Sequence, residues 1–138
     1  MNIGGGVAHF AGIVGTQSFK LFNLEVAATG ITEVEAEKYG FQPVSAIIWG
    51  LPVGRPLAKG EKLGLKLVAD KPTGRLLGAQ AVGGKGAVAR INSISIALWS
   101  GLKLEEIGYL DLAYAPTFGG AWDAIDIAAQ GINEKAAL

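Results

Sequence analysis

The fold is decided by two stretches of sequence, KLGLKLVA at residues 62–69 and RLLGAQAV at residues 75–82. In the first stretch, leucines alternate with lysine and glycine, which is the period-two pattern of a β-strand with one buried face. The residues between the stretches, DKPTG at 70–74, form a turn longer than the two-residue type. The two stretches are therefore predicted to pair as an antiparallel β-hairpin.

Upstream of this hairpin, the sequence predicts two more strands and a short helix. Residues 17–29, QSFKLFNLEVAAT, are rich in strand formers, and both alternating sets contain apolar residues. This pattern predicts one strand that is covered on both faces. A capping box, TEVE, starts at Thr32, so a short helix is expected to follow it and to stop at Gly40. Another strand is expected over residues 44–49, followed by a glycine- and proline-rich loop at 50–60.

Downstream of the hairpin, three helices are expected. Residues 87–100 place apolar side chains at helical spacing, while Ile96 and Trp99 lie off that stripe. Such a helix needs burial on more than one side. Two further helices are predicted over residues 104–109 and 121–136.

Together these elements predict an α+β domain, in which an antiparallel sheet has helices packed on one face. The expected order of elements is β-α-β-β-β-α-α-α. Residues 1–15 are glycine-rich and lack a clear period, so we expect a leading segment there and a single domain over residues 16–138.

Composition narrows the classes of function. The chain has 138 residues, of which 50% are apolar and 17% charged, so an oligomer interface is a natural place for the excess apolar surface. The net charge is zero, which makes nucleic acid a poor partner. The chain has no cysteine and one histidine, His9, so thiolate catalysis and a clustered metal site are not expected. No apolar run is long enough to span a membrane, and a cytoplasmic location is expected.

Two groups of residues have the form of ligand sites. Residues 84–89, GKGAVA, fit a loose dinucleotide-binding pattern, but the strand before them belongs to a hairpin. We therefore predict a glycine turn, and anion binding beside Lys85 at the start of the helix stays open. Asp123 and Asp126 are predicted to lie on a solvated helix face.

The segment at residues 111–123, DLAYAPTFGGAWD, places Tyr114, Phe118 and Trp122 around Pro116 between two helices. Large aromatic side chains on a loop are typical of interface anchors and pocket walls. They could equally fill the core, and the pattern alone leaves both interpretations open.

This segment also carries a resemblance to a known family. AYAPTFGGAWD resembles the Y-A-P-P-F…W-D segment of NADH oxidases and coenzyme A-disulfide reductases. Three further blocks agree in order: FKLFNLEVAATG with TEVEA at residues 19–36, TGRLLGAQAVG at 73–83 and RIN at 90–92. Over about residues 10–131, the chain resembles the C-terminal dimerisation domain of the pyridine-nucleotide disulfide oxidoreductases.

The resemblance implies a twofold homodimer in which the aromatic segment faces the flavin and reactive cysteine of the other subunit. Tyr114 would be the catalytic tyrosine acting in trans, and Pro116 and Phe118 would line the flavin cofactor. FAD and NAD(P)H are implied for the parent enzyme, and none is expected to bind this chain alone. The residues that the resemblance assigns to the interface are Arg90, Ile91, Ile94, Leu98, Tyr114, Phe118 and Trp122.

The sequence departs from the family pattern in the loop at residues 50–60, which lacks the family's second tyrosine, and at Thr117, which replaces a second proline. No nucleotide-binding fold or cysteine precedes the domain, so the chain is predicted to be catalytically incomplete alone. FAD- and NAD-binding domains would then lie upstream or on a separate polypeptide. The alternative is a stand-alone protein that binds a coenzyme A-like anion through Arg55, Lys59, Lys85 and Tyr114.

Overall fold

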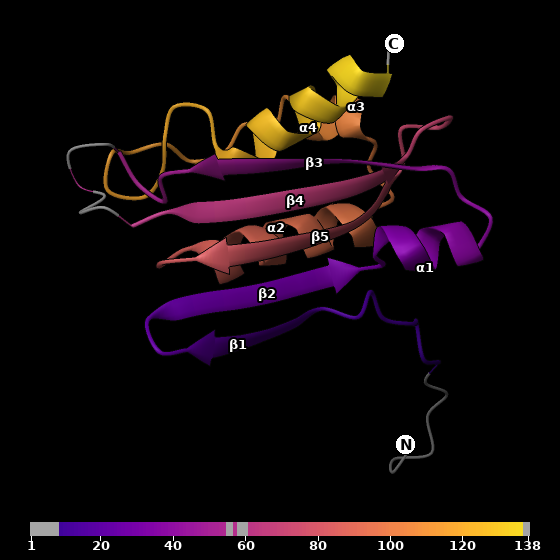
Figure 1. Cartoon of the computed structure of the whole chain (residues 1–138), viewed down its shortest axis with the longest axis horizontal. Helices are drawn as coiled ribbons and strands as arrows, with labels where there is room; N and C mark the ends of the chain where they lie inside the picture. Colours follow the sequence, from indigo (N-terminus) through magenta and orange to yellow (C-terminus); the bar gives the residue numbers. More distant parts are fainter. Residues whose placement is uncertain (1–8, 55–56, 58–60, 137–138) are drawn as a thin grey trace.

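The computed structural model describes residues 9–54, 57 and 61–136. Its centre is a five-stranded antiparallel sheet with the strand order β1-β2-β5-β4-β3 (Figure 1). The strands are β1 (Gln17–Leu21), β2 (Leu24–Gly30), β3 (Pro43–Gly50), β4 (Leu63–Asp70) and β5 (Leu76–Gly83). The helices are α1 (Glu33–Lys38), α2 (Ala87–Trp99), α3 (Leu104–Ile107) and α4 (Ala124–Ala136). This arrangement is the predicted α+β class.

The hairpin of β4 and β5 forms the middle of the sheet, as the alternating pattern predicted. The strands pair from Leu63 opposite Gly83 to Ala69 opposite Leu76, with a shift of register between Val68 and Ala69. The three leucines of β4 that share a face are fully buried. Asp70 closes the turn, since its main-chain carbonyl accepts from Gly74 N at 2.8 Å.

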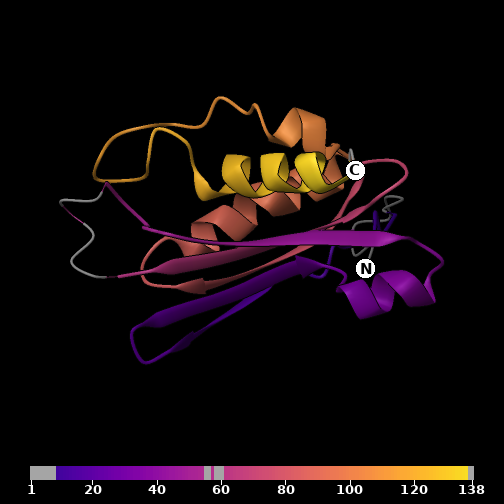
Figure 2. The ribbon, with the colours of Figure 1, turned by 45° about the horizontal axis from the view of Figure 1, so that its top comes forward.

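Helices α2 and α4 lie side by side on one face of the sheet, as Figure 2 shows. Helix α2 packs mainly on β2 and β5, and α4 packs on β3 and β4, with α3 against α4. The main core lies between these two layers. Its largest fully buried side chains include Leu65, Leu67, Ile91, Ile94 and Ile132.

Helix α1 lies apart from the other helices, at one end of the opposite face (Figure 1). Its N-cap is Thr32, whose hydroxyl accepts from Glu35 N at 3.3 Å while the Glu35 carboxylate accepts from Thr32 N at 2.8 Å, so the predicted capping box is present. Ala36 packs with Val68 and Leu77 in a small second core. The rest of this face, between β1 and β3, carries no helix within the described residues.

The prediction of one strand over residues 17–29 is wrong, because the chain turns back at Phe22 and Asn23. Phe22 adopts a left-handed backbone with φ of 51°, and β1 and β2 pair on either side of it. Phe19 lies opposite Val26, so the two alternating apolar sets lie on the same face of a hairpin rather than on two faces of one strand. Strand β1 is an exposed edge strand.

Helix α4 begins three residues later than predicted, at Ala124, because Asp123 is the residue that caps it. Residues 9–15 form no helix or strand, although Val14 O accepts from Gly30 N at 2.7 Å. The division into a leading segment of residues 1–15 and a domain over residues 16–138 stays a prediction. None of the helices in the described part of the chain is long and apolar enough to cross a membrane.

Candidate functional site

The segment at residues 111–123, called the aromatic loop below, connects α3 to α4 and carries its large side chains on the surface. Tyr114, Phe118 and Trp122 are 59%, 78% and 58% exposed. The interpretation that they fill the core is therefore wrong. Three exposed aromatics on one short loop are a surface suited to contact with another molecule.

The middle of the aromatic loop is shaped by a turn and fastened to the loop between β3 and β4. The amides of Phe118 and Gly119 donate to Ala115 O at 2.8 and 3.1 Å, which closes the turn around Pro116. Gly54 N donates to Pro116 O at 2.7 Å. Two segments about sixty residues apart in the sequence thus lie side by side at this edge of the domain.

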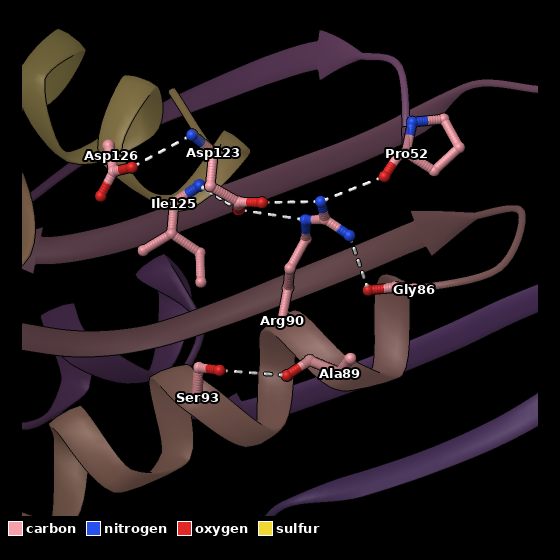
Figure 3. A network of polar contacts seen from close by, with 8 residues as sticks. All are labelled: Pro52, Gly86, Ala89, Arg90, Ser93, Asp123, Ile125 and Asp126. Carbon is pink, nitrogen blue, oxygen red and sulfur yellow. Dashed lines mark hydrogen bonds and ion pairs between the residues drawn. The ribbon is translucent and has the colours of Figure 1, made fainter. Parts of the chain in front are cut away.

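Arg90 fastens the end of the same loop (Figure 3). Its Nε and Nη2 donate to the two carboxylate oxygens of Asp123 at 3.0 and 2.6 Å, a two-pronged ion pair. Its remaining donors reach Gly86 O at 3.1 Å and Pro52 O at 3.3 Å. One buried guanidinium therefore joins the start of α2, the β3–β4 loop and the end of the aromatic loop.

Asp123 also starts α4, together with Asp126. Asp123 Oδ1 accepts from Ile125 N at 3.1 Å, and Asp126 Oδ2 accepts from Asp123 N at 3.1 Å. This reciprocal arrangement is a variant of the capping box, in which the N-cap side chain accepts from the second helical residue instead of the third. The prediction that these two aspartates lie on a solvated face is wrong, because Asp126 is only 4% exposed and Asp123 is paired with Arg90.

Asp126 is electrostatically unusual. Burial raises the pKa of its carboxyl above the ordinary value of 3.8, and the nearby Asp123 charge adds to the rise, while the hydrogen bond from Asp123 N opposes it. The second oxygen, Oδ1, is buried and accepts no hydrogen bond in the described structure. A buried carboxylate oxygen without a donor is costly, so the Asp126 carboxyl has an unmet need for a hydrogen-bond donor.

The start of α2 does not provide a free anion site. Glu25 Oε2 accepts from Gly86 N at 2.9 Å and from Val88 N at 3.1 Å. The amides that would hold a pyrophosphate are thus taken by the chain's own carboxylate, and Gly86 with φ of 107° serves the predicted glycine turn. These residues do not fit a dinucleotide, and Lys85 is an exposed lysine beside a helix start that is already capped.

Four residues that the sequence assigned to an interface lie on α2, where Arg90, Ile91 and Ile94 are buried within the chain and Leu98 is half-buried. Ile91 and Ile94 are buried against the sheet, Arg90 holds Asp123, and Leu98 packs partly against the core. Their helical stripe faces the domain's own sheet, so the isoleucines are core residues with no surface to offer a partner. The exposed apolar side chains of α2 are instead Ile96 and Trp99.

The interface assignment of Arg90, Leu98, Tyr114, Phe118 and Trp122 stays a prediction, as do the trans roles of Tyr114, Pro116 and Phe118. Arg55 and Lys59 lie outside the described residues.

A pocket of about 520 Å³ opens between the β3–β4 loop and the end of the aromatic loop. Trp49, Trp122 and Ile127 form apolar parts of its wall, and Lys62 and Arg90 contribute basic groups.

Sequence reasoning missed Asp123 as the partner of Arg90, since a separation of 33 residues has no local signal. Within residues 9–54, 57 and 61–136, no cluster of three His, Cys, Asp or Glu residues could hold a metal ion.

The sequence of the chain matches one family model, the pyridine nucleotide-disulphide oxidoreductase dimerisation domain, over residues 16–125. The chain belongs to this dimerisation-domain family. It is 37% identical over 129 residues to an NAD(P)H sulfur oxidoreductase (CoA-dependent) of Pyrococcus furiosus, covering 94% of this chain and 29% of that protein. It is 27% identical over 134 residues to an NADH oxidase of Methanocaldococcus jannaschii, covering 97% of this chain and 30% of that protein.

A solved structure agrees with this membership of the dimerisation-domain family. The NAD-dependent persulfide reductase from A. fulgidus superposes with a TM-score of 0.92 at 32% identity, covering 99% of this chain and 25% of that one. The chain thus spans less than a third of the length of these relatives. The predicted resemblance to this family is confirmed.

Proposed function

We propose that this chain is a homodimerisation domain of an FAD- and NAD(P)H-dependent enzyme of the disulfide reductase and NADH oxidase type, and that it is catalytically incomplete alone. The observation that carries the proposal is the match to the dimerisation-domain family together with an exposed aromatic loop fixed at several points. FAD and NAD(P)H would bind domains upstream or on a separate polypeptide. The partner for dimerisation is a second copy of the chain.

The aromatic loop exposes its large side chains to a partner molecule instead of packing them within its own domain. Exposed aromatic side chains lose little entropy on contact, and a loop held in place by Arg90 and Gly54 is already ordered before it meets a partner. In the dimer, the Tyr114 hydroxyl would donate a hydrogen bond to the reactive thiolate of the other subunit. Pro116 and Phe118 would lie against the flavin there.

The alternative function, a stand-alone protein that binds a coenzyme A-like anion, receives less support. Lys85 stands beside amides that already bond to Glu25, and the Arg90 guanidinium donates to Asp123, Gly86 and Pro52 within the chain. A calorimetric titration of the chain with coenzyme A is expected to give no heat of binding. Saturable heat would favour the alternative.

Analytical ultracentrifugation of the chain tests the dimer. We expect twice the chain mass, persisting on dilution, and a loss of that mass in the variant Phe118→Ser. Phe22→Ser is the matched control, because Phe22 is also a largely exposed phenylalanine but lies on the β1–β2 turn. A monomer at every concentration would contradict the proposal, as would equal weakening by both variants.

The trans role is tested in a chimera in which this chain replaces the dimerisation domain of the Pyrococcus furiosus relative. Tyr114→Phe is expected to lower NADH-dependent turnover while the chimera keeps its flavin and its dimeric mass. Unchanged turnover would remove Tyr114 from the reaction. Copurification of flavin with NADH turnover by the isolated chain would show that the chain is not incomplete.

A further inference from the structure

A second pocket lies where the start of the aromatic loop meets the first turn of α4, and the proposed function does not use it. Its volume is about 310 Å³. The residues of its wall that bear on ligand binding are Tyr109, Asp111, Ala113, Trp122, Asp123 and Asp126.

Asp126 lines this pocket and carries an oxygen without a hydrogen-bond partner. This residue is 4% exposed, its Oδ2 accepts from Asp123 N, and its Oδ1 has no hydrogen-bond donor in the described structure. A carboxylate oxygen removed from water needs a donor to offset its lost hydration. The group missing from the pocket is therefore a hydrogen-bond donor.

The charge of the wall indicates that this donor is positive. Three of the ten lining residues are aspartates and none is basic. Asp123 is compensated by Arg90, which approaches it with two donors, whereas Asp111 and Asp126 have no cation within the lining. A concave surface with this charge raises the local concentration of cations.

The shape and the aromatic rings favour an organic cation over a metal ion. Tyr109 and Trp122 both line the pocket with largely exposed rings, and cations bind over the faces of such rings. Among the residues described, the aspartates do not converge into a metal-binding cluster. A volume of about 310 Å³ suits a guanidinium or ammonium head with part of its carbon chain.

We propose that this pocket binds a cationic nitrogen group, an alkylguanidinium or alkylammonium, whose N–H donates to the Asp126 carboxylate while its carbon chain lies against Trp122. The group can come from an Arg or Lys side chain of a second copy of the chain, or from a free small amine. The first source rests on the proposed dimer, and the second does not. The pocket chemistry is the same for both.

The test is a titration of the 138-residue chain with methylguanidinium, followed by NMR at the Trp122 indole N–H and the Asp126 amide. We expect saturable shifts that are confined to the pocket. Asp126→Asn keeps the acceptor for Asp123 N but loses the charge, and it is expected to weaken binding about tenfold or more. Glu37→Gln, on the exposed side of α1, is the control and is expected to change nothing.

Ala113→Leu is a second variant that leaves both aspartates in place and fills the pocket, so it is expected to abolish the shifts. Tetraethylammonium, which has no N–H, is expected to bind more weakly than methylguanidinium. The proposal is overturned if both variants bind like the parent chain, if Mg²⁺ gives the same shifts, or if the shifts spread over the whole surface.

Sedimentation separates the two sources. If a second copy supplies the nitrogen, Asp126→Asn weakens the dimer and methylguanidinium competes with dimerisation. If the source is a free amine, the dimer is unaffected while the variant still loses the probe. A monomeric chain that binds methylguanidinium sinks the proposed dimer and leaves this inference standing, whereas a dimer in which methylguanidinium shifts neither the Trp122 indole N–H nor the Asp126 amide overturns this inference alone.

Discussion

The two faces of the sheet are made by alternate residues of the same strands, yet they end in different surroundings. On the face beneath α2 and α4, the leucines of β4 are fully buried. On the opposite face, a row runs across the sheet from Phe19 through Val26, Val82 and Gly64 to Trp49, as the strand registers show. Phe19 and Trp49 at the two ends of this row are 61% and 66% exposed.

Because burial differs between the two faces, the same kind of interaction is expected to contribute differently to the free energy of unfolding on each face. Both faces hold apolar side chains, an ion pair and a perturbed carboxyl. Arg90 and Asp123 pair under the loops of the covered side, and Lys66 pairs with Glu33 on the open side. The same chemistry is therefore expected to have a large effect on one face and a small effect on the other.

The ion pairs should show the largest contrast. Arg90→Met leaves the half-buried Asp123 without its partner and two main-chain carbonyls without their donor, which is expected to cost about 3–5 kcal/mol of unfolding free energy. Lys66→Met breaks a more exposed pair and is expected to cost less than about 1 kcal/mol. Urea unfolding followed by circular dichroism measures both. Equal losses would mean that the covered pair is as well hydrated as the open one.

Truncation of apolar side chains should give the next largest contrast. Leu65→Ala opens a cavity in the covered core and is expected to cost about 2–5 kcal/mol. Ile47, on the open face of β3, is 59% exposed, and Ile47→Ala is expected to cost less than about 1 kcal/mol in the monomer. The comparison is measured by thermal unfolding at the same protein concentration. A large loss for Ile47→Ala would show that the open face is covered in solution.

Two glycines on the open face differ in how closely other residues cover them. A Cβ at Gly78 would lie 2.2 Å from Ile31 O, a main-chain atom that cannot move away easily, so Gly78→Ala is expected to cost about 1–3 kcal/mol. A Cβ at Gly64 would lie 2.9 Å from the Trp49 ring, which is exposed and can turn outward. Gly64→Ala is expected to stay within about 1 kcal/mol of the parent chain. The reverse order in denaturant midpoints would contradict this view of the face.

The smallest contrast is in pH dependence, where two carboxyls act in opposite directions. The hydrogen bond from Lys66 holds the pKa of Glu33 below its ordinary value of 4.5, so its stabilisation is present above that pH and is lost as the pH falls through the lowered pKa. Burial raises the pKa of Asp126 above 3.8, so its stabilisation is full below that pH and is lost as the pH rises through the raised pKa.

Unfolding free energies of Glu33→Gln and Asp126→Asn, measured across the acid range, separate these two effects. Relative to the parent chain, Glu33→Gln should lose less stability on acidification, and Asp126→Asn should gain stability toward neutral pH. Slopes of the same sign for both variants would contradict the opposite pKa shifts.

Much of the local structure could be predicted because its signals lie within a few residues. The alternation in β4 predicted the hairpin, and the side chains of Thr32 and Glu35 predicted the start of α1. The turn at Phe22 was missed, because a phenylalanine in a left-handed conformation carries no turn signature. A pattern of apolar residues therefore located strands but not the reversal between β1 and β2.

The candidate site depended more on tertiary contacts. The sequence indicated that residues 111–123 are unusual, but not whether their aromatics face the core or the solvent. It also assigned Ile91 and Ile94 to an interface, because a helical stripe shows which side chains share a face without showing what lies opposite that face. The packing of α2 on the sheet decided this question.

The sequence by itself determined the fold class, the family, the central hairpin and the capping box of α1, since alternation, caps and ordered motifs are local properties of the chain. Only the tertiary structure brought Asp123 to Arg90, closed the start of α2 with Glu25 and buried Asp126 Oδ1 without a donor. These contacts join residues 33 to 63 positions apart or depend on the burial of a whole helix turn. Hydrogen bonding and desolvation act through space, so no pattern along the chain records them.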